Sequence, residues 1–175
     1  DEIEDVLRRA KKLLDDLRRV VKKANDDSRR LLKKLKDKVE EVSRRSRRLA
    51  EDLERTVGRD EDVERVAREL ERLNRKLEDE LRRVATEVRD LNDKHRRLLE
   101  KAEREVKRLI DELRERKLPV EDVLREVRKI IEDVKRASEK ILEESRKLIE
   151  DVERRLEEIL KRSEDLIRTV KERKR

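Results

Sequence analysis

The chain has 175 residues, of which 59% are charged and 33% hydrophobic, and its formal net charge is +7. It contains no Cys, Met, Phe, Tyr or Trp, and only one Gly and one Pro. The lack of cysteine excludes disulfides and thiolate metal sites, and no apolar run approaches the roughly 20 residues of a membrane span. Such a composition is typical of long helices and coiled coils. We expect a soluble protein with no membrane partner, cytoplasmic when expressed recombinantly.

Apolar residues recur at steps of three or four in three stretches of equal length. The stretches run from Ile3 to Leu53, from Val63 to Leu113 and from Val120 to Val170. Each has a period of about 3.57 residues, between the 3.5 of a coiled coil and the 3.6 of a straight helix. A second apolar residue often follows the first, which widens the face enough to contact two neighbours. The pattern predicts an all-α fold of three coiled-coil-like helices, each of about 55 residues.

Capping signals place the ends of the first two helices. The first is predicted over about residues 2–57, followed by Gly58, which tolerates positive φ beyond a helix end. Asp60 is expected to cap the second helix, over about residues 60–117, which finishes in basic residues that suit the negative end of the helix dipole.

Pro119 is expected at the first position of a third helix, over about residues 119–173, where its missing N–H is not needed. Both connections are only a few residues long, which forces neighbouring helices to run antiparallel. We therefore predict an up-down-up antiparallel three-helix bundle that forms a single domain over residues 1–175. Because few apolar residues remain for the outer surface, we expect a monomer that requires no partner.

Ten polar residues interrupt or flank the apolar faces, and they fall at two heights when the second helix is counted in the reverse direction. A buried polar group without a partner costs about 1–3 kcal/mol, so we predict that each layer is buried and hydrogen bonded. Such layers would specify the fold, because sliding a helix would place polar groups against apolar ones. The central layer comprises Asn25, Ser28, Asn92, His95, Ser138 and Ser145, and the distal layer comprises Ser43, Ser46, Asn74 and Ser163.

The aliphatic faces, charged surface, single Gly and Pro and polar layers together resemble de novo designed helical bundles with buried hydrogen-bond networks. The stretch SEKILEESRKLI, residues 138–149, is similar in style to designed cage-and-latch switch proteins. The resemblance implies no natural biochemical function or localisation, and a role as a structural scaffold or a test of fold specification. An alternative is an interaction module, or caged-helix switch, in which the third helix exchanges with a designed helical partner.

Catalysis and metal binding are further alternatives for His95, which falls at the height of Ser138. A Ser–His nucleophile pair needs an orienting acid, an oxyanion hole and substrate access, whereas the residue one turn before His95 is Asn92. Di-iron bundles present Glu-x-x-His from facing helices, but this chain has Asn-Asp-Lys-His and a single histidine. We therefore predict no enzyme, no catalytic residue, no metal and no cofactor, and a neutral His95 with a pKa below about 6.5.

The basic excess lies mainly in the first helix, where residues 1–57 contain 19 basic and 14 acidic side chains. The absence of aromatic residues for base stacking argues against a dedicated nucleic-acid site, and the simplest interpretation is a solvated face. Weak nonspecific binding of anions or nucleic acid is a further alternative. The candidate basic band comprises Arg29, Arg30, Lys33, Lys34, Arg44, Arg45, Arg47 and Arg48.

Overall fold

The computed structural model describes residues 1–174, which form three long helices and contain no strand. Helix α1 spans Glu2–Val57, α2 spans Glu61–Arg114 and α3 spans Val120–Arg173. All three pack against one another, so the predicted all-α three-helix bundle is confirmed.

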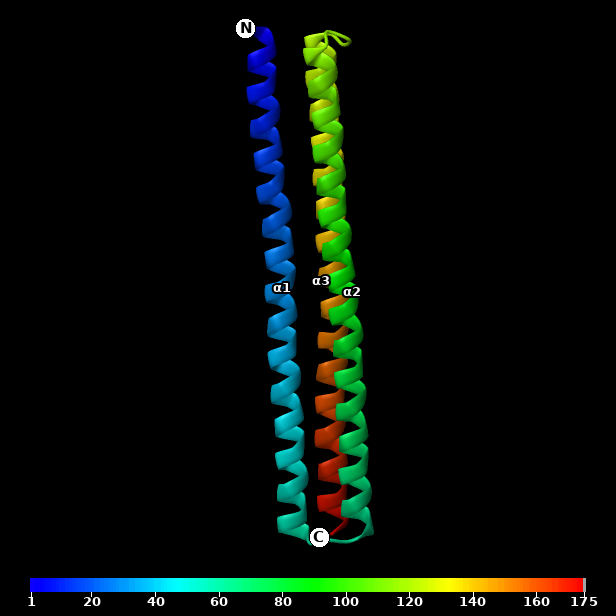
Figure 1. Ribbon diagram of the computed structural model, residues 1–175. Helices are drawn as coiled ribbons and strands as arrows, with labels where there is room; N and C mark the ends of the chain where they lie inside the picture. Colours follow the sequence, from blue (N-terminus) through cyan, green and yellow to red (C-terminus); the bar gives the residue numbers. More distant parts are fainter. Residues whose placement is uncertain (175) are drawn as a thin grey trace. The chain divides into compact units, whose positions relative to one another are not determined.

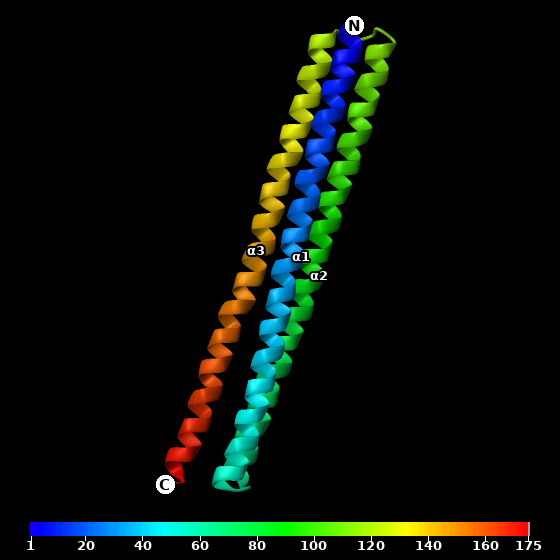
Figure 2. The same cartoon turned by 90° about the vertical axis from the view of Figure 1, so that its left-hand side faces the viewer.

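The chain divides into two compact units, and all three helices contribute to both. Unit 1 comprises Asp1–Arg29 and Val88–Ser145, and unit 2 comprises Arg30–Glu87 and residues 146–174. In unit 1 the first turns of α1 lie beside the last turns of α2 and the first turns of α3 (Figures 1 and 2). Consecutive helices in this unit are therefore antiparallel.

Each unit has an aliphatic core. In unit 1, Leu17, Val106 and Val123 are completely buried, and in unit 2 Leu53 and Leu70 are at most 2% exposed. Full burial of such a side chain contributes about 1.5–3 kcal/mol, so the regular apolar faces supply the main driving force for assembly. The same regularity gives little preference for one register over another.

The first turns of the helices are capped in two ways. The Oδ1 atom of Asp1 accepts a hydrogen bond from the Ile3 amide at 3.2 Å, and Oδ1 of Asp60 accepts one from the Val63 amide at 3.0 Å. At α3 the backbone carbonyl of Pro119 accepts from the Val123 amide at 3.2 Å, as the carbonyls of Asp1 and Asp60 do at the other two helices, but the proline side chain has no acceptor to add. Pro119 thus precedes the helix as its cap, and α3 begins one residue later than predicted.

The two connections end their preceding helices differently. Gly58 has φ 94°, as expected for the residue after α1. Helix α2 ends at Arg114, three residues earlier than predicted, because Arg116 takes the left-handed conformation with φ 60°. Its amide donates to the Leu113 carbonyl at 3.0 Å, and the next amide along the chain, that of Lys117, donates to the Glu112 carbonyl at 2.9 Å, which forms a Schellman motif.

Replacing Arg116 by glycine is expected to stabilise the chain by about 1 kcal/mol, because glycine adopts the left-handed conformation without a steric penalty. Urea unfolding followed by far-ultraviolet circular dichroism measures the change. Gly58→Ala is the matched control and should destabilise by about 1 kcal/mol, since the added Cβ meets no atom within 4 Å but φ is positive. A loss of stability in Arg116→Gly would contradict the role assigned to this residue.

Candidate functional site

The structure buries all ten side chains of the predicted polar layers, none of which is more than 6% exposed. The central layer lies in unit 1 and the distal layer lies in unit 2. The two layers differ in their hydrogen bonding, so each is described separately.

His95 of α2 links the other two helices in unit 1. Its Nδ1 atom lies 3.0 Å from Oδ1 of Asn25 on α1, and its Nε2 atom is hydrogen bonded to Oγ of Ser138 on α3. Because the amide oxygen only accepts, Nδ1 carries the proton and donates it, and Nε2 then accepts from the Ser138 hydroxyl. A single neutral imidazole with both nitrogens paired therefore ties α1, α2 and α3 together.

Ser28 and Asn92 add a second link between α1 and α2. The Oγ atom of Ser28 lies 3.0 Å from Oδ1 of Asn92 and 2.9 Å from the backbone carbonyl of Asn25. The hydroxyl has one proton, so it donates to one of these acceptors at a time. We call Asn25, Ser28, Asn92, His95 and Ser138 the central network.

Burial lowers the pKa of His95, as expected from the sequence. A folded pKa below the unfolded value means that the unfolded chain binds the proton first, so stability should fall as the pH drops through about 6.5. We expect the urea midpoint of unfolding to decrease as the pH is lowered from about 8 to about 5.5. A His95→Leu variant, which lacks the titrating group, should show a flatter profile over this range, and equal slopes would refute the linkage.

Ser145 was predicted in the central layer but is not part of the central network. Its side chain is fully buried, and its Oγ atom has no hydrogen-bond partner. It follows Ser138 by seven residues, or about two turns of α3.

The two serines should therefore respond oppositely to alanine. Ser138→Ala removes the donor to the His95 ring and is expected to cost about 1–3 kcal/mol, whereas Ser145→Ala removes an unpaired hydroxyl and should be neutral or stabilise by about 1 kcal/mol. Chemical denaturation of the two variants side by side measures this difference. Equal losses would show that Ser145 has a partner in solution.

Ser138, His95 and Asn25 have the connectivity of a nucleophile, a base and an orienting group. The sequence suggested Asn92 as the neighbour of His95, but the residue at Nδ1 is Asn25 from another helix. The exposed fractions of Ser138, His95 and Asn25 are only 2%, 0% and 6%. The three side chains therefore lie inside the core of unit 1, where they join the three helices.

The distal layer does not form the interhelical hydrogen-bond network that was predicted. The Oγ atoms of Ser43 and Ser46 and Oδ1 of Asn74 are buried without partners. Ser163 donates to the Ile159 carbonyl of its own helix at 2.7 Å. Equal height along the bundle brings these residues to the same level, but their side chains do not point at one another's polar atoms.

The apolar pattern gave no sign that Glu80 would be buried. This residue of α2 is 7% exposed, and its Oε1 atom lies 3.3 Å from Nη1 of Arg155 on α3. Its Oε2 atom has no hydrogen-bond partner. The apolar residue of this helical turn is the neighbouring Leu81, so the pattern predicts that Leu81 faces the core. In the structure Glu80 is buried and Leu81 is only half-buried.

The predicted basic band is exposed throughout, and two of its arginines are paired with carboxylates. Arg29 lies 3.7 Å from Asp26, and Arg45 lies 3.3 Å from Glu164 on α3. Exposed pairs of this kind contribute about 0–1 kcal/mol each, so they lower the local charge more than they stabilise the fold.

Within residues 1–174, no group of three or more His, Cys, Asp or Glu side chains is placed to hold a metal ion. No helix in the described part of the chain is long and apolar enough to cross a membrane. Comparison with protein-family models, curated proteins and solved structures finds no match to this chain. The functional interpretation therefore depends on the geometry of the polar groups alone.

Proposed function

We propose that the chain is a designed, non-catalytic structural scaffold whose central network specifies how the three helices pair. The observation that carries this proposal is the His95 imidazole, which is paired at both nitrogens with side chains from the other two helices. The network lies within an otherwise aliphatic core. The protein is expected to be a monomer of 21.4 kDa, which light scattering would test.

The apolar faces alone leave the register ambiguous. Sliding one helix by seven residues returns apolar residues to nearly the same face, because seven residues are close to two turns. The same slide of α1 against α2 would separate Asn25 from His95 and leave these buried atoms unpaired, at about 1–3 kcal/mol for each, because Arg18 and Leu32 lie seven residues to either side of Asn25. The central network therefore penalises alternative registers that the apolar residues tolerate.

The decisive experiment removes the network while keeping the core apolar. We define the apolar-network variant as the combination Asn25→Leu, Ser28→Ala, Asn92→Leu, His95→Leu and Ser138→Ala. Spin labels at Arg18→Cys and Glu103→Cys, whose parent side chains lie 3.2 Å apart in unit 1, report the pairing of α1 with α2. We expect one narrow distance distribution in the parent chain and several distances in the apolar-network variant. A single unchanged distance would refute register specification.

A second candidate function is helix exchange, with α3 as the mobile element. Outside the core, α3 is held to its neighbours by partly exposed ion pairs, including Lys38–Glu153 at 3.4 Å and Arg162–Glu69 at 3.6 Å, which are individually weak. A protease site placed in the connection 115–119 would allow the folded chain to be cleaved without removing α3. Replacement of α3 by a labelled peptide of residues 119–175 would support an interaction module or switch, and retention of the original helix would favour the scaffold.

A third candidate is weak anion or nucleic-acid binding through the basic band, supported by its exposed arginines and lysines. Binding of this kind is electrostatic, so affinity for a duplex oligonucleotide should fall steeply with salt and be lost by about 0.3 M. Tight binding that survives this salt concentration would argue for a dedicated nucleic-acid site.

A further inference from the structure

The α1–α2 side of unit 2 is hollowed where polar atoms lack partners. A hollow of about 580 Å³ is lined by residues that include Ser43, Arg47 and Glu78. A second hollow of about 370 Å³ shares Arg47 and Glu78 and is lined also by Ser46 and Asn74. The interhelical ion pairs described above for this unit all involve α3, so they leave these α1–α2 hollows unbridged.

The unpaired atoms point to a ligand. Ser43 is 5% exposed, Ser46 1% and Asn74 5%, and each has a buried oxygen with no hydrogen-bond partner. Buried groups in this condition normally hydrogen bond to protein, water or a bound species. A bound molecule with acceptor oxygens would accept from the Ser43 and Ser46 hydroxyls, whereas Oδ1 of Asn74, which only accepts, needs a donor such as water.

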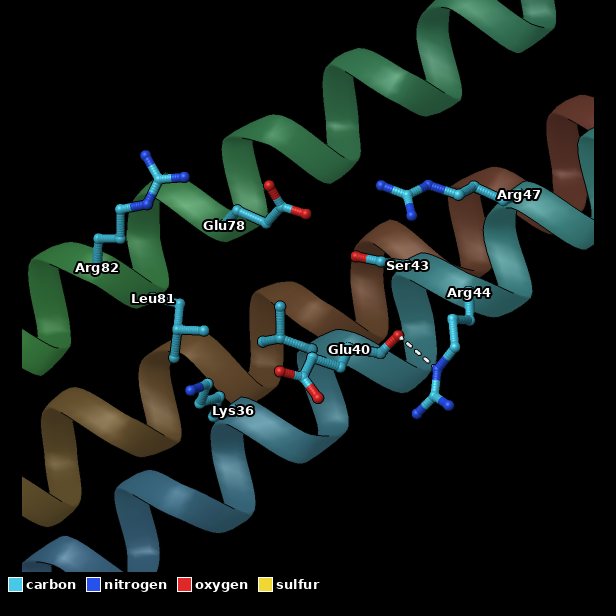
Figure 3. Close-up of a pocket in the computed structure, with 9 residues that line it drawn as sticks. Lys36, Glu40, Ser43, Arg44, Arg47, Glu78, Leu81 and Arg82 are labelled. Carbon is cyan, nitrogen blue, oxygen red and sulfur yellow. Dashed lines mark hydrogen bonds between the residues drawn. The ribbon is translucent and has the colours of Figure 1, made fainter.

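The charges around the larger hollow select an anion. Four cationic side chains line it against the two carboxylates of Glu40 and Glu78. Figure 3 shows Ser43 and Arg47 pointing into the space between α1 and α2, where Glu78 also lies. Arg44 turns away and donates from Nε to the Glu40 carbonyl at 3.5 Å. Arg82 lies 3.5 Å from Asp79, so Arg47, Lys36 and the Ser43 hydroxyl are the donors most readily available to a bound oxygen, and Glu78 would compete with it for Arg47.

We propose that the larger hollow binds a tetrahedral oxyanion of the phosphate type, either the free ion or the phosphate of a monoester. The Ser43 hydroxyl donates one hydrogen bond, and the Arg47 guanidinium supplies charge and a second donor. A volume of about 580 Å³ lies within the range of small-ligand sites. The site is independent of the scaffold function, which depends on the central network in unit 1.

The test is titration of the full chain with inorganic phosphate at constant ionic strength, followed by calorimetry and by backbone amide resonances. We expect saturable one-site binding, with the largest shifts in residues 36–47 and 78–82. Arg47→Ala should weaken binding about tenfold and Ser43→Ala about fivefold, as expected for loss of a charged and a neutral hydrogen bond. Glu78→Gln should tighten it about fivefold, because the competing carboxylate is removed.

Two matched variants control for charge and for unpaired hydroxyls. Arg89→Ala removes an exposed arginine of α2 in unit 1, and Ser145→Ala removes a buried unpaired hydroxyl in unit 1, so neither should change phosphate affinity. Binding of O-phosphoserine at the same resonances would extend the site to phosphomonoesters, and binding of inorganic phosphate alone would assign it to the free ion. Absence of saturation, equal weakening by Arg89→Ala and Arg47→Ala, or no tightening in Glu78→Gln would overturn the proposal.

Discussion

Replacing His95 by alanine is expected to lower the free energy of unfolding by about 3–5 kcal/mol. The side chain is completely buried, so truncation leaves a cavity in the core of unit 1. It also leaves Oδ1 of Asn25 and Oγ of Ser138 without the ring nitrogens that they bond. Urea or guanidinium unfolding followed by circular dichroism measures the loss.

The apolar-network variant shows how much of the loss in His95→Ala comes from leaving polar atoms unpaired, and how much stability the intact network itself contributes. Removing all five side chains of the central network together leaves none of their partners unpaired in the core, so this variant should remain within about 1 kcal/mol of the parent chain or exceed its stability. We therefore expect the five substitutions of the apolar-network variant to lower the free energy of unfolding by less than His95→Ala alone. A loss in the apolar-network variant equal to or larger than that of His95→Ala would mean that the network contributes net stability rather than specificity.

Replacing Asn25 by aspartate is expected to reverse the dependence of stability on pH. The substitution is nearly isosteric and places a carboxylate oxygen at the position 3.0 Å from Nδ1 of His95. A carboxylate there favours the imidazolium and should raise the pKa of His95 above its unfolded value. The folded chain then holds the proton longer than the unfolded chain, so stability should fall as the pH rises through the raised pKa.

The expected loss for Asn25→Asp between about pH 6 and about pH 9 is about 1.5–3 kcal/mol, the range of a hydrogen bond to a charged group. The parent chain should gain stability as the pH rises from about 5.5 to about 8, because burial alone lowers the pKa of its histidine. Urea midpoints measured across both ranges give the two slopes. The double variant Asn25→Asp with His95→Leu should lose the reversal, and persistence of the reversal would mean that another group titrates.

The helices and the buried positions follow from one-dimensional patterns, which is why the sequence predicts them well. Helix α1 has the bounds that were expected, and Asp60 caps α2 through its side chain. The early end of α2 was missed because Arg116 occupies a left-handed position where the pattern contains no glycine. Backbone strain of this kind has no compositional signature.

Hydrogen-bond partners were less predictable than burial. Height along a helix gives the level of a residue, but its rotation about the helix axis and its rotamer decide which atoms meet. His95 and Ser138 share a height and are bonded, whereas Ser145 was expected at the level of Ser28 and remains unpaired. The distal layer shows the same limitation, because alignment of four polar residues did not produce a bond between helices.

The burial of a single histidine in an aliphatic core has a practical consequence for spectroscopy. The chain contains no Phe, Tyr or Trp, so the carbon-bound ring protons of His95 are its only aromatic ones. In deuterated solvent, once the amide and guanidinium protons have exchanged, the corresponding region of a proton spectrum reports on one site, at the junction of three helices, without isotope labelling of the protein. Opening of unit 1, exchange of α3 or a shift of register would each appear as a change in two resonances, and the protein thus contains its own probe of correct assembly.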